Sequence, residues 1–148
     1  MKTSERFENA VKKLYNAFHS GTLIPECYKQ CAVGNICDNA DSWKHLTDNH
    51  GSTTLNYVGL VNERLGRKIN GYKPSQLIRI EASFLRGCGY SLPLSHSSFR
   101  PKDPTSQDVL FDGLCETIVL LCEIEGIPDI MDFSNIFDYE PKSLELNE

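Results

Sequence analysis

Apolar residues recur at helical spacing along most of the chain. Phe7, Val11, Leu14 and Phe18 lie at i, i+4, i+7 and i+11, which places them on one face of a helix. Gly21 follows and is a typical helix-ending residue. The sequence contains no internal repeat and no alternating apolar and polar pattern longer than a few residues. The pattern therefore predicts an all-α fold.

The most apolar predicted helix is Ser106–Glu125. Two adjoining apolar stripes run along it, so more than one of its faces must be covered by other helices. We expect a single-domain bundle of about five to six helices over residues 1–137, packed around this central helix. Residues 138–148 are predicted to be an acidic tail that frays.

Further helices are expected between these two. A short helix entered at Pro25 would carry Cys27 and Cys31 at i and i+4, and residues 42–48 would add one or two helical turns. Two longer helices would follow residues 51–54 and the N-cap Ser75. In the first of these, the residues expected to line one side against the core are Thr54, Val58, Val61 and Leu65. In the second, the apolar face continues to Glu81 and Cys88, which should point inward.

The composition gives a cellular setting for the cysteines. The first residues are charged and have no apolar signal region, and no apolar run approaches eighteen residues. We therefore expect a cytoplasmic protein. In a reducing compartment, six cysteines are better explained as metal ligands or free thiols than as disulfides.

The cysteine spacing is the main functional signal. Cys27, Cys31 and Cys37 follow one another within eleven residues, and Cys88 lies between two glycines that allow a close backbone approach. Converging thiolates bind soft metals, so these four residues are the predicted metal ligands. Structural zinc sites favour paired short knuckles, whereas iron–sulfur clusters accept irregular spacing and a remote fourth ligand. The spacing thus favours a cluster, most simply 4Fe–4S, over zinc.

Other interpretations of these residues remain open. Some or all of the cysteines could be free, buried thiols. His45 or His50 could replace one cysteine as a ligand, because imidazole binds both zinc and iron. An inward Glu81 could accept a hydrogen bond beside the ligands or pair with an arginine, and metal ligation is its less favoured use. Cys115 and Cys122, on the central helix, are expected to be core residues.

Charge is distributed unevenly along the chain. Residues 1–102 carry fourteen Lys or Arg against eight Asp or Glu, and residues 103–148 carry one Lys against twelve acids. The two parts should attract one another. The basic segment Arg64–Arg86 is a solvated face or a docking surface for an acidic protein partner. A pI of about 5.4 and the lack of a basic motif interleaved with aromatic residues argue against nucleic-acid binding.

Residues 27–38, read as Cys-Tyr-Lys-Gln-Cys-Ala-Val-Gly-Asn-Ile-Cys-Asp, and the later Gly87-Cys88-Gly89-Tyr90 resemble a family of small bacterial four-cysteine proteins. Members of this family are often labelled as one of the subunits of the sodium-translocating NADH-quinone reductase. The resemblance covers about the first ninety-five residues. It implies that the four-cysteine pattern is a family feature, and that the protein takes part in redox chemistry.

The sequence thus predicts an iron–sulfur module for electron transfer or redox sensing, with a cluster held by Cys27, Cys31, Cys37 and Cys88. The alternative is a non-catalytic zinc-stabilised interaction domain that uses the same four cysteines. An enzyme ranks third, because no acid–base pair or activated nucleophile stands out.

Overall fold

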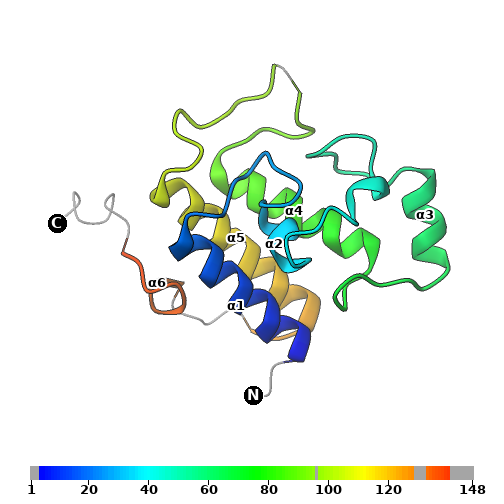
Figure 1. Ribbon diagram of the computed structural model, residues 1–148, viewed down its shortest axis with the longest axis horizontal. Coiled ribbons are helices and arrows are strands. Elements are labelled where there is room, and N and C mark those ends of the chain that lie inside the picture. Colours follow the sequence, from blue (N-terminus) through cyan, green and yellow to red (C-terminus); the bar gives the residue numbers. More distant parts are fainter. Residues whose placement is uncertain (1–3, 96, 129–132, 141–148) are drawn as a thin grey trace.

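The computed structural model describes residues 4–95, 97–128 and 133–140, and within these ranges the regular elements are helices (Figure 1). An isolated β-bridge between Ile69 and Tyr72 closes a turn. The all-α prediction is confirmed. The helices are α1 (Glu5–Ser20), α2 (Ala32–Ile36), the 3-10 helix η1 (Lys44–Leu46), α3 (Tyr57–Arg64), α4 (Pro74–Cys88), α5 (Gln107–Glu125) and α6 (Phe133–Ile136).

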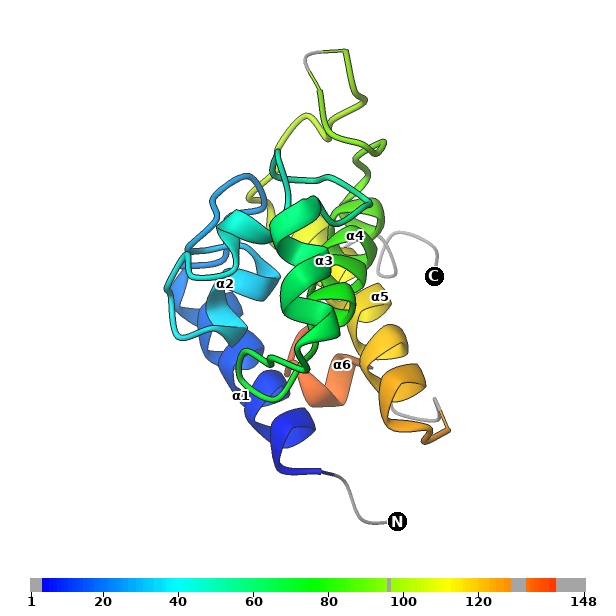
Figure 2. The same cartoon turned by 90° about the vertical axis from the view of Figure 1, so that its right-hand side faces the viewer.

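The helices α4 and α5 form the most extensive pair in the molecule, and α1 packs against α5 and α2 (Figures 1 and 2). As predicted, α5 is central, and its N-cap is Ser106, whose hydroxyl accepts the N–H of Val109. Glycine allows α4 and α5 to approach closely. A Cβ atom at Gly113 would lie 2.4 Å from the Sγ of Cys88, and one at Gly87 would lie 2.8 Å from the carbonyl oxygen of Asp112.

The predicted helix through Cys27 and Cys31 is wrong. Residues 25–30 form turns, and α2 begins only after Cys31, which is its N-cap. The Asn35 side chain holds this turn by donating to the backbone carbonyls of Gln30, at 2.9 Å, and Cys31, at 3.0 Å. Since α2 starts after both cysteines, they do not share a helical face.

The predicted orientation of α3 is also wrong. The residue of α3 that is buried is Gly59, whose Cα faces the carbonyl oxygen of Leu46 closely enough that a Cβ would lie 2.5 Å from it. The large apolar residues on the opposite side therefore face solvent. Exposed there are Tyr57, Val58, Leu60, Val61 and Leu65.

The ends of two elements differ from the sequence-based expectation or lie beyond it. The helix α4 begins at Pro74 with Lys73 as its N-cap, rather than at Ser75. Residues 141–148 of the predicted tail lie outside the described residues, as do residues 129–132 of the expected last helix. No helix in the described part of the chain is long and apolar enough to cross a membrane.

Candidate metal site

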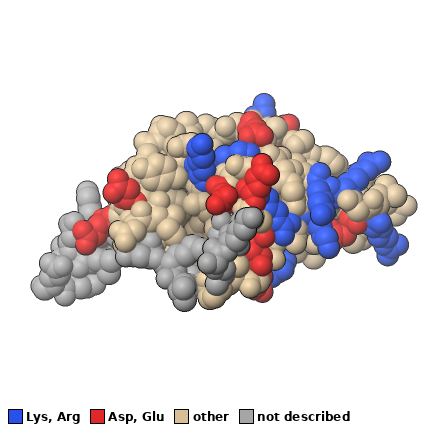
Figure 3. All heavy atoms as spheres, turned by 90° about the horizontal axis from the view of Figure 1, so that it is seen from below, with Lys and Arg blue, Asp and Glu red and all other residues tan. Residues whose placement is uncertain are grey.

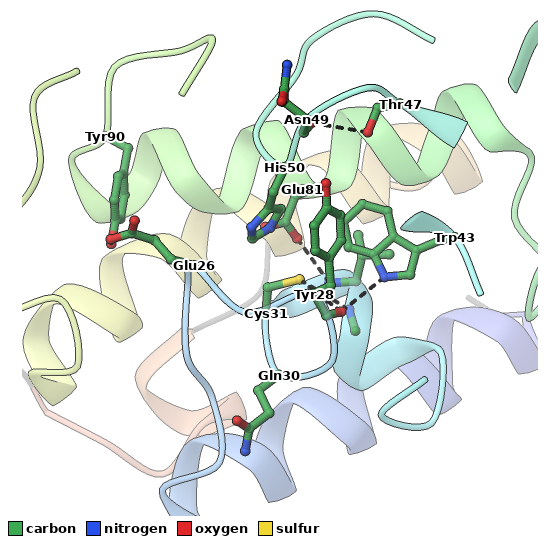
Figure 4. Close-up of polar contacts among 12 residues, drawn as sticks. Glu26, Tyr28, Gln30, Cys31, Trp43, Thr47, Asn49, His50, Glu81 and Tyr90 are labelled. Atoms are coloured by element: carbon green, nitrogen blue, oxygen red, sulfur yellow. Dashed lines mark hydrogen bonds and ion pairs between the residues drawn. The ribbon is translucent and has the colours of Figure 1, made fainter. Parts of the chain in front are cut away.

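Three side chains from separate segments meet beneath α2. The Sγ of Cys31, an imidazole nitrogen of His50 and a carboxylate oxygen of Glu81 all lie within 4.8 Å of one another. Among the described residues, this is the one group of three or more Cys, His, Asp or Glu side chains that meets this distance. Figure 4 shows the three side chains converging from the loop before α2, the loop before α3 and the middle of α4.

A tight turn positions Cys31. Its Sγ caps α2 by accepting the N–H of Gly34 at 3.4 Å, and the thiol faces the carbonyl oxygen of Tyr28 at 3.7 Å. Glycine is required at position 34, because a Cβ there would lie 2.3 Å from that same carbonyl oxygen. Cys31 is fully buried. The sequence around it therefore fixes the direction of the sulfur.

Glu81 projects from α4 into the buried side of this turn. One carboxylate oxygen, Oε1, accepts the backbone N–H of Val33 at 3.2 Å, and the other, Oε2, lies 3.0 Å from the Nε2 of His50. The side chain is only 4 % exposed. A carboxylate at this depth needs such partners, and the bond to Val33 leaves Oε2 directed toward His50.

His50 completes the group from the loop that follows η1. Its side chain is 10 % exposed, and its ring also makes a hydrogen bond with the backbone of Glu26. A metal-binding histidine usually makes a second bond of this kind, which orients the ring. The imidazole is therefore held from two sides.

Aromatic rings cover the group. The ring of Tyr28 lies 4.5 Å from the His50 ring and 5.2 Å from the Trp43 ring, and Trp43 and His50 are 5.9 Å apart. The indole N–H of Trp43 donates to the carbonyl oxygen of Tyr28 at 3.1 Å. As predicted, Trp43 is buried near the cysteine-rich turn. The rings shield the three polar side chains from water (Figure 4).

The electrostatics suit a thiol that stays protonated until a cation arrives. Burial raises the pKa of Cys31 well above its usual value, and the Glu81 carboxylate raises it further. Burial alone would lower the pKa of His50, but the hydrogen bond and charge of Glu81 outweigh burial, so this pKa is raised. A nucleophilic cysteine needs a lowered pKa and access to substrate. Cys31 has neither property.

The other predicted ligands lie around this group without joining it. Cys27 is half-buried on the turn before Cys31, and Cys37 is buried at the C-cap of α2. Cys88 is buried at the end of α4 beside Gly113 of α5. None of the three joins Cys31 in a set of three ligand atoms within 4.8 Å. The site made of four cysteines stays a prediction.

The sequence contained weak signals for two of the three residues found together. The helical phase of α4 placed Glu81 inward, and His50 was one of two histidines considered as replacement ligands. His45, the other histidine, is exposed. Nothing in the spacing indicated that Cys31, His50 and Glu81 would meet, because they come from three elements whose packing decides their positions.

Comparison of the chain with known protein families, curated proteins and solved structures finds no match. The site is therefore interpreted from its own geometry.

Proposed function

We propose that the protein is a small metal-binding module that holds one zinc ion between Cys31, His50 and Glu81. The observation that carries this proposal is the convergence of their ligand atoms within 4.8 Å. The segments bearing these atoms are far apart in the sequence. Buried, mixed donors of this kind are typical of bound cations, because a positive ion offsets the cost of burying a thiolate and a carboxylate together.

The types of donor favour zinc over an iron–sulfur cluster. Zinc binds thiolate sulfur, imidazole nitrogen and carboxylate oxygen, whereas cluster ligands are mostly thiolates. In the proposed site the ion takes the place of the proton between Nε2 of His50 and Oε2 of Glu81, and of the proton on Cys31. The hydrogen bond from Val33 to Oε1 of Glu81 then holds the carboxylate in position.

The proposed role of the ion is structural. It would join the turn before α2, the loop before α3 and helix α4, three segments that otherwise meet through packing and the hydrogen bonds of Glu81. Cys31 is inaccessible and aromatic rings cover His50, which leaves little room for a substrate. Metal binding then contributes to the free energy of folding.

An iron–sulfur module for redox chemistry is the second candidate. One observation favours it: the charge of Glu81 raises the pKa of the thiols of Cys31, Cys37 and Cys88 alike. Three of the four predicted cluster ligands thus lie within electrostatic reach of one carboxylate. This function requires the cysteine-bearing segments to move until their sulfurs converge.

Metal analysis of the full chain separates the two candidates. The protein is purified without oxygen, and zinc, iron and acid-labile sulfide are measured per chain, together with the visible spectrum. We expect about one zinc, no sulfide and no colour, since zinc does not absorb visible light. A brown protein with about four irons per chain would support the cluster. A protein that binds neither metal after reconstitution would refute both.

Variants assign the ligands. Cys31→Ser, His50→Gln and Glu81→Gln should each weaken zinc binding by at least about tenfold, as expected for loss of one ligand. The matched controls are His45→Gln, at an exposed histidine, and Cys122→Ala, at a buried cysteine of α5. Both should bind zinc like the unaltered chain. Equal losses in the controls would show that the variants act through folding rather than through ligation.

A further inference from the structure

The outward face of α3 and the turn that follows it form a surface with an unusual combination of properties. Five large apolar side chains are exposed within nine residues, with Tyr57 at 80 % and Leu65 at 61 %. Exposed apolar groups that are contiguous in this way commonly mark a protein interface. The helix lies at one end of the long axis of the molecule (Figure 1), and it faces the viewer in Figure 2.

A cavity of about 360 Å³ lies beside this helix. Apolar side chains of Leu46, Ile69 and Pro74 line it, and so do the basic or titratable side chains of His45, Arg67 and Lys68. Such a cavity is suited to an apolar side chain that has a carboxylate next to it. Anchor pockets of this kind supply much of the affinity in small interfaces.

The charge of this surface is positive. Arg64, Arg67 and Lys68 are all exposed, and Lys and Arg gather toward this end of the molecule in Figure 3. Neighbouring Glu63 is engaged with α4, because its two carboxylate oxygens accept the N–H of Ser75 at 3.0 Å and the hydroxyl of Ser75 at 2.7 Å. The surface therefore favours a partner that offers both carboxylates and apolar side chains.

This chain itself carries a segment of that chemistry. Residues 138–148 include four acids against one lysine, and Leu144 and Leu146 alternate with Glu145 and precede Glu148. The chain enters this segment beside the start of α5, where the hydroxyl of Tyr139 donates to Asp108. That region and α3 lie at opposite ends of the molecule (Figure 1). The segment therefore meets the α3 surface of another copy more readily than its own.

We propose that residues 141–148 of one copy bind the α3 surface of a second copy, with the leucines on the apolar face and in the cavity and the glutamates beside Arg64, Arg67 and Lys68. Because the two surfaces differ, the contact is heterologous, and further copies can add in the same way. The proposal uses none of the proposed zinc ligands, so it stands or falls independently of the metal.

Sedimentation velocity of the full chain at increasing concentration tests the proposal. We expect association at low salt that weakens as salt rises, because the charged pairs are exposed and screened. Leu144→Ser/Leu146→Ser should weaken association at least about tenfold, and so should Arg67→Glu/Lys68→Glu, since both remove anchors of the contact. The matched control, Lys12→Glu/Lys102→Glu, makes the same change of net charge at exposed lysines elsewhere and should associate at least as well as the unaltered chain.

A peptide of residues 138–148 provides a second measurement that needs no altered protein. Added in excess, it should dissociate the full chain, whereas the same peptide with both leucines replaced by serine should not. A chain that stays monomeric at millimolar concentration overturns the proposal. So does association that survives the double-leucine variant or excess peptide, since the occupant of the surface would then be something other than this segment.

Discussion

A substitution at the contact of α4 with α5 tests whether Cys88 is a packing residue. A methyl group at Gly113 would lie 2.4 Å from the Sγ of Cys88 and 2.9 Å from both Cδ1 and the carbonyl oxygen of Phe84. All of these atoms belong to buried residues. Gly113→Ala must therefore displace the sulfur or move the two helices apart.

The size of the effect follows from two opposing contributions. Alanine in a helix interior gains up to about 1 kcal/mol over glycine, whereas overpacking a core costs roughly 1–3 kcal/mol. We expect Gly113→Ala to lower the free energy of unfolding by about 1–2 kcal/mol, which for a chain of this length lowers the thermal midpoint by roughly 2–4 °C per kcal/mol. Cys88→Ala removes the obstructing sulfur. The double variant should then be more stable than the sum of the single effects by about 1 kcal/mol.

Urea unfolding of the four proteins of this cycle, without metal, gives the coupling energy. Additive effects would refute the close approach of Cys88 to Gly113, and so would a stabilised Gly113→Ala chain. The same proteins test the sequence-based prediction, under which loss of Cys88 removes a ligand. If zinc is held by Cys31, His50 and Glu81, Cys88→Ala keeps its full zinc content. Loss of metal from this variant would instead favour the four-cysteine site.

Three further results are expected. Ser106→Ala should cost about 1 kcal/mol by removing the α5 cap, whereas Ser97→Ala, at an exposed position in a loop, should leave thermal melts unchanged; equal melts for both would mean that the cap contributes nothing. Zinc affinity should fall as the pH falls, about tenfold per unit for each proton released, because the raised pKa of the Cys31 thiol means that zinc must displace its proton; a flat profile in competition titrations from about pH 8 to about pH 6 would contradict this. Zinc should change the fluorescence of Trp43, whose ring lies 5.9 Å from that of His50, and no change should occur in His50→Gln.

Periodicity predicted the parts of the fold in which a helix has one broad apolar face or is apolar all round. Phe7, Leu14 and Phe18 are buried along α1, and α5 is central. It failed at α3, where Val58, Val61 and Leu65 do share one side of the helix, but that side is exposed. Periodicity identifies which residues lie together. The close contact at Gly59 decides which side faces inward.

The candidate site shows a different limit. Cysteine spacing predicts ligands well when one short turn presents them all. Here the turn that holds Cys31 is built by the side chain of Asn35 and by the need for glycine at position 34, so the helical phase did not apply. The partners of the sulfur, His50 and Glu81, follow it by 19 and 50 residues. Their meeting depends on how α4 packs beneath α2.

The hydrogen bonds of the site also define what a metal would add. Within the described part of the chain, no buried side-chain nitrogen or oxygen lacks a partner, and Glu81 is satisfied by Val33 and His50 without an ion. The metal-free chain therefore carries no uncompensated buried charge at this position, in contrast to small domains that unfold when their zinc is removed. A bound ion would strengthen an arrangement that the protein already forms. Zinc would then act as a clamp on a folded chain, joining Cys31 to α4, and its removal should loosen the turn before α2 while leaving the α4–α5 core intact.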